Sequence, residues 1–136
     1  MIKAGTTLRV ARSTDNLDEV VRFYTDGLGL SVIGSFENHE GFDGVMLGFA
    51  DAGYHLEFTY CHPHPVAPTP TQEDLAVFYI PEMSKWENAC ANMVTAGFKQ
   101  VRSLNPYWEL QGRTFEDEDG YRIVLQKAEW NNVEVS

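Results

Sequence analysis

The sequence of 136 residues has no long hydrophobic run. Its longest uninterrupted apolar stretch is residues 75–80, LAVFYI, which is far shorter than the roughly 20 residues that cross a bilayer as a helix. The first residues, MIKAGTT, also lack the apolar segment of a secretory signal peptide. We therefore expect no membrane partner and no signal for secretion.

Basic residues are scarce. Ten Lys and Arg stand against 20 Asp and Glu, which gives a formal net charge of −10 at pH 7. A surface of this sign repels the phosphate backbone, so we expect no nucleic-acid partner. The same charge attracts cationic small molecules.

Cysteine is rare as well, with only Cys61 and Cys90. Two such widely spaced cysteines exclude a disulfide framework and a CxxC redox motif. A reducing compartment suits this composition, and we expect a cytoplasmic protein. The chain is 43% hydrophobic and 22% charged, which is typical of one ordinary globular domain at this length.

The first half of the chain predicts a strand, a helix and three further strands. Residues 7–12 alternate as a half-buried strand does. Asn16 with Glu19 has the pattern of an N-cap and capping box, and Gly27 or Gly29 can end the helix. The three following strands are predicted, in order, at residues 30–36, 45–49 and 54–60.

Residues 61–71 hold four of the six prolines and predict an extended linker. Beyond it, the same order of elements returns. Ser84 with Glu87 predicts a second capping box, and Trp86 and Cys90 lie on the apolar stripe of that helix, where we expect core residues. The predicted strands of this half are, in order, residues 75–80, 98–101, 112–115 and 121–126.

The predicted fold is therefore α+β, with two βαβββ modules in a single domain. The modules span residues 1–60 and 72–127, joined by the linker at 61–71 and followed by a tail at 128–136. They share the order of elements rather than sequence identity.

Two local motifs carry a family resemblance. The first half contains Phe23-Tyr24-x-x-x-Leu28-Gly29-Leu30, and the second contains Phe115-x-Asp117-x-Asp119-Gly120. With this order of elements, the chain resembles the vicinal oxygen chelate superfamily of glyoxalase I, extradiol dioxygenases, fosfomycin-resistance enzymes and bleomycin-binding proteins. It is most similar to the uncharacterised bacterial branch. The resemblance implies a cupped mixed sheet with helices on its convex side, and a homodimer.

The resemblance also implies a divalent metal held by His, Glu or Gln side chains from four strands. In this sequence those positions fall on Arg9, on Glu57, on Leu75 or Val77, and on Val124. Only Glu57 could bind a metal ion, and one carboxylate leaves most of a coordination shell empty. Arg9 adds a positive charge that is not lost in proteins. We therefore expect no metal site and no cofactor, with a divalent metal as the alternative.

We hypothesise that Arg9 replaces the metal and pairs with Glu57, because strand alternation puts both on the predicted concave face. The alternative is that Arg9 extends into solvent and leaves Glu57 alone. His55 shares this face as a general base, a hydrogen-bonding group in the cavity or a structural histidine. His62 and His64 have metal-ligand chemistry but lie in the linker, where we expect them to be solvated.

The predicted ligand-binding residues share the concave face or its mouth: Arg9, His55, Glu57, Tyr79, Trp108 and Arg122. One hypothesis is a glyoxalase/bleomycin-resistance-like protein that binds a small molecule without metal, a cationic ligand or an antibiotic being the candidates. The alternative is a divergent lyase, isomerase or dioxygenase, metal-dependent or not, whose catalytic candidates are Glu57, His55 and Arg9. A structural dimer with a filled cleft is a third reading.

Overall fold

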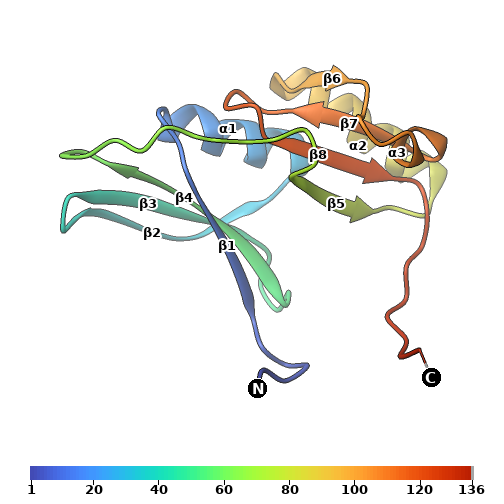
Figure 1. Cartoon of the computed structure of the whole chain (residues 1–136), viewed down its shortest axis with the longest axis horizontal. Coiled ribbons are helices and arrows are strands. Elements are labelled where there is room, and N and C mark those ends of the chain that lie inside the picture. Colours follow the sequence, from blue (N-terminus) through green and yellow to red (C-terminus); the bar gives the residue numbers. More distant parts are fainter. Residues whose placement is uncertain (136) are drawn as a thin grey trace. The chain divides into compact units, whose positions relative to one another are not determined.

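The proline-rich segment separates two units of the chain. The computed structural model describes residues 1–135. Its first unit is Met1–Thr69 and its second begins at Pro70, so the boundary falls inside the predicted linker (Figure 1). Each unit has its own sheet and its own long helix.

The first unit contains four strands and one helix. Its elements are β1 (Leu8–Ser13), α1 (Leu17–Leu28), β2 (Ser31–His39), β3 (Phe42–Gly48) and β4 (Tyr54–Cys61). The second unit repeats this order and adds one short helix. Its elements are β5 (Leu75–Tyr79), α2 (Met83–Ala96), β6 (Lys99–Val101), α3 (Tyr107–Leu110), β7 (Gly112–Glu116) and β8 (Arg122–Gln126).

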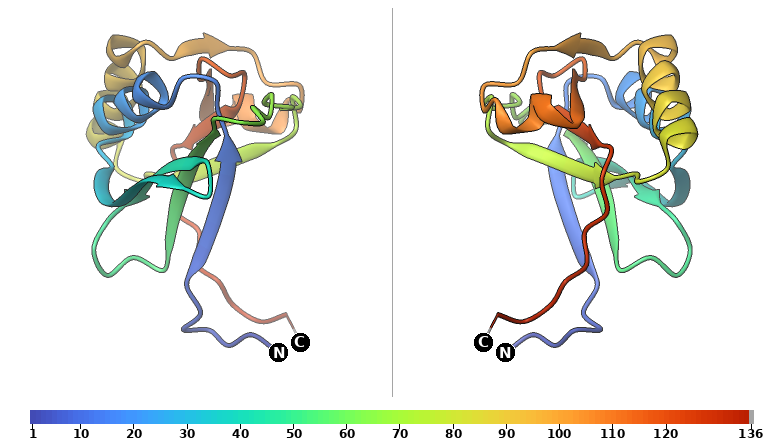
Figure 2. Two further views of the ribbon diagram at one scale, coloured as in Figure 1. Left: turned by 90° about the vertical axis from the view of Figure 1, so that its left-hand side faces the viewer. Right: turned by 90° about the vertical axis from the view of Figure 1, so that its right-hand side faces the viewer.

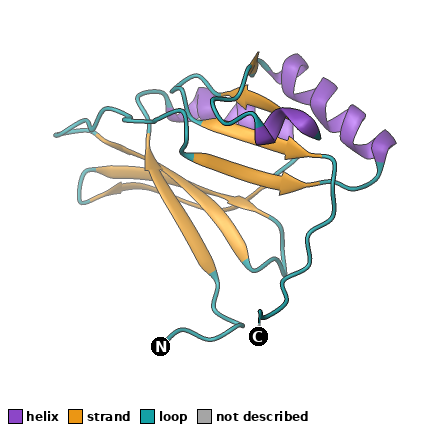
Figure 3. Ribbon diagram, turned by 45° about the vertical axis from the view of Figure 1, so that its right-hand side comes forward, coloured by secondary structure: helices purple, strands orange, loops and turns teal. Residues whose placement is uncertain are grey.

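The two sheets have the same topology. The strand orders are β1-β4-β3-β2 and β5-β8-β7-β6, and in each the first strand pairs in parallel with the last (Figure 3). The two predicted βαβββ modules and the α+β class are therefore confirmed. After β8 the chain continues as an extended tail (Figure 2). None of the helices within residues 1–135 is long and apolar enough to cross a bilayer.

Helix α1 begins and ends where its capping residues predict. The Asn16 side chain accepts a hydrogen bond from the Glu19 backbone N–H at 3.2 Å, which confirms the N-cap. The prediction of a capping box is wrong, because the Glu19 carboxylate does not accept from the Asn16 N–H. That N–H donates to Thr14 Oγ1, and the Glu19 carboxylate accepts from Arg22. Gly29 ends the helix in the left-handed region at φ 72°.

The core of the first unit lies between α1 and one face of its sheet. Val20 and Tyr24 of α1 are fully buried, as is Phe58 of β4 at 1% exposure. The rings of Tyr24 and Phe58 lie 4.8 Å apart. Leu56 and Phe58 therefore point toward the helix, and the alternate residues of β4, such as Glu57, point to the opposite face.

Helix α2 begins earlier than the predicted capping box allows. It starts at Met83 after Glu82, and the Ser84 hydroxyl donates to the Glu82 side chain. Ser84 thus lies inside the first turn, and the capping prediction is wrong. Trp86 and Cys90 are buried as expected, and the Trp86 indole N–H donates to the Leu125 carbonyl at 2.8 Å.

Strand β3 is longer than its apolar pattern predicts and begins at Phe42 rather than Val45. The interruption in the pattern is Gly44. A Cβ there would collide with the ring of Phe36 on the neighbouring strand, so the glycine is required by packing. The short helix α3 was not predicted, since its four residues carry no periodicity.

Candidate functional site

The face of the first sheet that points away from α1 carries the predicted site residues. In the parallel pairing of β1 with β4, Arg9 is opposite His55 and Ala11 is opposite Glu57. Residues directly opposite each other in such a pair project to the same side. We call this side, defined by Arg9, Ala11, His55, Glu57 and Thr59, the Glu57 face.

Arg9 binds two acceptors on the Glu57 face. Its Nη1 lies 3.3 Å from Glu57 Oε2, and its Nε donates to His55 Nε2 at 2.8 Å. The Arg9 side chain is 46% exposed and that of Glu57 only 12%. The predicted Arg9–Glu57 pair is therefore confirmed as a contact, and the alternative of an Arg9 that leaves Glu57 alone is wrong.

The bond from Arg9 determines what His55 can do. An arginine Nε–H can only donate, so His55 Nε2 must be the acceptor and the imidazole proton must lie on Nδ1. A doubly protonated His55 could not make this bond. His55 thus orients the guanidinium, and its Nε2 lone pair is unavailable for a general base while the bond persists.

The residues present do not fit the metal that the fold family implies. The Oε2 atom of Glu57 is already bonded to a guanidinium. The other expected positions, Leu75, Val77 and Val124, carry no donor atoms in their side chains. Among residues 1–135, no group of three or more His, Cys, Asp or Glu side chains is arranged to hold a metal ion.

A cavity opens beside Glu57 on the same face. Its volume is about 380 Å³, which is within the range of roughly 300–1,000 Å³ found for ligand sites. We call it the Glu57 hollow. Its lining residues come from β1 to β4 and the β2–β3 turn: Ala11, Arg12, Ser13, Phe36, His39, Glu40, Phe42, Glu57 and Thr59.

Two phenylalanines form the apolar part of the Glu57 hollow. Phe42 is 39% exposed although it is aromatic. The Phe36 ring lies over Gly44 and has the His39 ring edge-on at 6.2 Å. Neither phenylalanine was predicted as a site residue, because only the register of the β2–β3 hairpin, which sets Phe36 opposite Gly44, brings it to the same face as Phe42.

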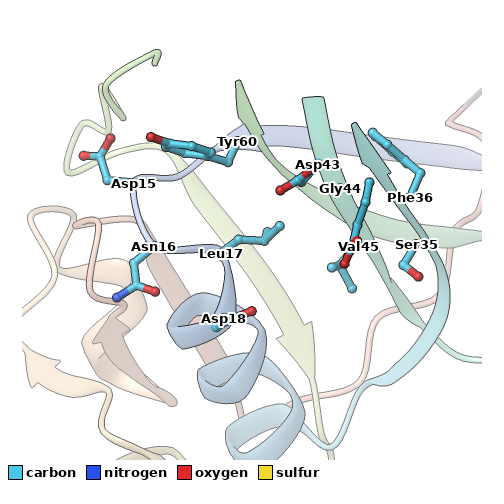
Figure 4. A pocket seen from close by; sticks show the side chains of 11 residues that line it. Asp15, Asn16, Leu17, Asp18, Ser35, Phe36, Asp43, Gly44, Val45 and Tyr60 are labelled. Carbon is cyan, nitrogen blue, oxygen red and sulfur yellow. The ribbon is translucent and has the colours of Figure 1, made fainter. Parts of the chain in front are cut away.

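A second, smaller hollow lies on the α1 side of the same sheet. Its volume is about 270 Å³, and side chains from the start of α1 face those of β2 to β4 across it (Figure 4). Four carboxylates line it, from Asp15, Asp18, Glu37 and Asp43. We call it the acidic hollow.

Asp43 joins the acidic hollow to the start of the linker. Its carboxylate accepts from the Asn38 backbone N–H at 2.9 Å and lies 2.7 Å from His62 Nε2. The Asn38 N–H, and then His62, hold the pKa of Asp43 below its usual value. The His62 ring also meets Tyr60 edge-on at 5.0 Å. His62 is solvent-exposed as expected, with 51% of its side chain accessible, and it also contacts Asp43.

The other three predicted ligand-binding residues belong to the second unit. The Arg122 Nε donates to Glu116 Oε2 at 3.0 Å and Nη1 donates to the Arg102 carbonyl at 3.4 Å, while Nη2 forms an ion pair with the same Glu116 oxygen at 3.0 Å. With 7% exposure, the Arg122 side chain supports its own sheet. Tyr79 is 38% exposed, and Trp108 of α3 is half-buried.

Two family models match the chain. One, described as the YycE-like N-terminal domain, covers residues 8–59, and the other, the YycE-like C-terminal domain, covers residues 73–127. The chain belongs to the YycE-like family. The uncharacterized protein YycE of Bacillus subtilis (strain 168) is 45% identical over 121 residues, which span 89% of this YycE-like chain and 87% of that protein.

Comparison with solved structures supports the assignment to this family. A crystal structure of YycE from Bacillus subtilis, described as a protein of unknown function and a candidate glyoxalase or fosfomycin resistance protein, has a TM-score of 0.88 and 42% identity, covering 96% of this YycE-like chain and 95% of that chain. Glyoxalase I from Zea mays follows with a TM-score of 0.67 and 20% identity over 88% of this chain and 45% of its own. The fosfomycin resistance protein FosX from Mesorhizobium loti has a TM-score of 0.69 and 11% identity over 93% of both chains. The resemblance to the vicinal oxygen chelate superfamily is confirmed, and the last two likenesses establish the fold alone.

Proposed function

We propose that this YycE-like protein binds a small organic molecule on the Glu57 face, and that the Arg9–Glu57 pair occupies the place where the superfamily resemblance implies a metal ion. The observation that carries the proposal is the contact of Arg9 Nη1 with Glu57 Oε2 at 3.3 Å. A guanidinium that is held by a carboxylate supplies the positive charge without coordination chemistry.

The position of the pair favours binding over a purely structural role. Glu57 also lines a cavity of about 380 Å³, and its Oε1 atom has no hydrogen-bond partner among residues 1–135. Ligand sites combine an apolar wall with a few placed polar groups. The Glu57 hollow provides both. A fold neighbour named for resistance to fosfomycin supports a small molecule as the ligand, and the candidates remain a cationic compound or an antibiotic.

A divergent enzyme of the same superfamily is the second candidate. It is favoured by the unpaired Oε1 of the half-enclosed Glu57, because a carboxylate in a cavity can take a proton from a substrate. In that case Glu57 is the base and Arg9 stabilises a developing oxyanion. His55 then acts as a positioning residue through its bond to Arg9.

We also propose a cytoplasmic homodimer. The cysteines Cys61 and Cys90 are both free and buried, as suits a reducing compartment such as the cytoplasm.

The proposed dimer would use strand β1. This strand lies at one edge of its sheet, where Leu8 and Val10 are 59% and 37% exposed. Association through this edge would cover both side chains. Sedimentation equilibrium of the full chain tests the dimer, and a monomer at every concentration contradicts it.

Two measurements on untagged protein test the main proposal. We expect elemental analysis to find less than stoichiometric zinc, iron, nickel or manganese, because one free carboxylate oxygen cannot hold an ion tightly. A thermal-shift screen of cationic compounds, 2-oxo acids and thiol adducts should return a compound that raises Tm for the wild type and not for Glu57→Gln. Stoichiometric metal that is lost in Glu57→Gln, or a screen without any hit, contradicts the proposal.

A further inference from the structure

We infer that the Glu57 hollow takes the positively charged end of a ligand with a flat aromatic body, with Glu57 as the charge partner and Phe36 and Phe42 as the walls. This inference rests on the proposed function and narrows its ligand class. It assigns a binding role to the two phenylalanines on the β2–β3 hairpin.

The first support is that the Glu57 carboxylate has hydrogen-bond acceptor sites without a protein partner. An ionised carboxylate can accept at about four sites on its two oxygens, and in residues 1–135 only Oε2 has a partner, Arg9. The side chain as a whole is 12% exposed. A charged N–H donor from a ligand gives the strongest bond to such an oxygen.

The second support is the aromatic wall. An aromatic ring attracts a cation placed over its face within about 6 Å of the ring centre. Phe42 is 39% exposed, so its ring is accessible to a bound ligand. The Phe36 ring is held over Gly44, which no larger residue could replace without moving it. A flat body can stack on these rings while its charged group reaches Glu57.

The third support is the pair of carboxylates on the wall of the hollow, those of Glu40 and Glu57. Arg9 is not among its lining residues, and its Nε and Nη1 atoms are engaged by His55 and Glu57. Arg12 also lines the hollow, although its pairing with Phe58 in the strand register starts its side chain on the α1 side. The carboxylates of Glu40 and Glu57 favour a cationic ligand over an anionic one at this wall.

The acidic hollow is the competing place for a cation in the same unit. It has four carboxylates but is smaller, at about 270 Å³ against about 380 Å³. It shares Phe36 with the Glu57 hollow, whereas Phe42 lines the Glu57 hollow alone. A probe can therefore be assigned to one hollow by the backbone signals that it shifts.

The test is a titration of ¹⁵N-labelled full chain with tryptamine, tryptophol and indole-3-acetate, which share an indole body and carry a positive, neutral or negative end. We expect tryptamine to shift the amide signals of Phe42 and Glu57. A hydrogen bond to a charged group should make it bind roughly tenfold tighter than tryptophol. Indole-3-acetate should bind most weakly.

Three variants locate the effect. Glu57→Gln should abolish the preference for tryptamine over tryptophol while leaving tryptophol binding nearly unchanged. Glu37→Gln makes the same change of charge in the acidic hollow and should leave the preference intact. Phe42→Leu, at a position that is 39% exposed, should weaken the binding of tryptamine and tryptophol together.

Several outcomes overturn the inference. It is wrong if the three probes bind equally, if tryptamine shifts Asp18 and Asp43 instead of Phe42, or if Glu37→Gln weakens tryptamine as much as Glu57→Gln. If no indole probe binds but the thermal-shift screen returns another ligand whose effect needs Glu57, this inference fails and the proposed function stands. If both experiments return nothing, both proposals are wrong.

Discussion

Separating Arg9 from Glu57 should cost measurable stability, and the cost should depend on both partners. Arg9→Met keeps most of the side-chain stem but removes the donors to Glu57 and His55. Glu57→Gln keeps the shape and removes the charge. A double-mutant cycle of these two substitutions isolates the interaction of the pair from the other effects of each change.

The expected coupling follows from geometry and exposure. A hydrogen bond to a charged group contributes about 1.5–3 kcal/mol when well buried, and an exposed ion pair about 0–1 kcal/mol. The Arg9–Glu57 contact is long at 3.3 Å, and Arg9 is 46% exposed while Glu57 is 12% exposed. We therefore expect a coupling free energy of about 1 kcal/mol at low salt, reduced at high salt by screening.

Urea denaturation of the four proteins measures this coupling through the unfolding free energies. The matched control is the exposed Glu19–Arg22 pair on α1, with Arg22→Met and Glu19→Gln, which should couple less strongly because both partners are solvated. A coupling at Arg9 and Glu57 below about 0.3 kcal/mol, within the error of additive sites, would refute the claim that this pair is a held structural unit.

Three further outcomes are expected. Asn16→Ala should lower the unfolding free energy by about 1 kcal/mol through loss of the α1 N-cap, with Asn16→Asp near wild type in the same urea assay. Trp86→Phe should cost about 1–3 kcal/mol, because it leaves the Leu125 carbonyl without its indole donor, and calorimetry should show a lower Tm. The pKa of Asp43 is lowered, so its stabilisation is present above its unfolded pKa and is lost as pH falls through its folded value. The advantage of wild type over Asp43→Asn should thus shrink below about pH 4, and a constant difference down to pH 2 would contradict it.

Local signals in the sequence determined much of the first unit. Asn16 predicts its helix start because a side-chain oxygen can accept from the first free N–H groups, and Gly29 predicts its end because glycine adopts positive φ without strain. Alternation in β4 placed His55 and Glu57 on one face. These rules act over a few neighbouring residues, so they need no knowledge of the rest of the chain.

Other features depend on contacts between distant segments. Arg9 lies beside His55 because β1 and β4 pair in one particular register, although the two residues are 46 positions apart in the sequence. No local pattern predicts that the Arg9 guanidinium then reaches the Glu57 carboxylate. The Glu57 hollow needs the β2–β3 register that sets Phe36 opposite Gly44 and so on the same side as Phe42. Helix α2 likewise begins ahead of its apparent capping residues, with Trp86 packed against β8.

The chain by itself thus determines the order of its elements, the faces of its strands and the residue types at the positions where the resemblance implies metal ligands, since each follows from residue type and spacing along the backbone. Only the folded sheet decides that Arg9 meets both Glu57 and His55, and that a hollow opens beside them. Those facts depend on strand register and side-chain reach, which are set by packing across the whole unit.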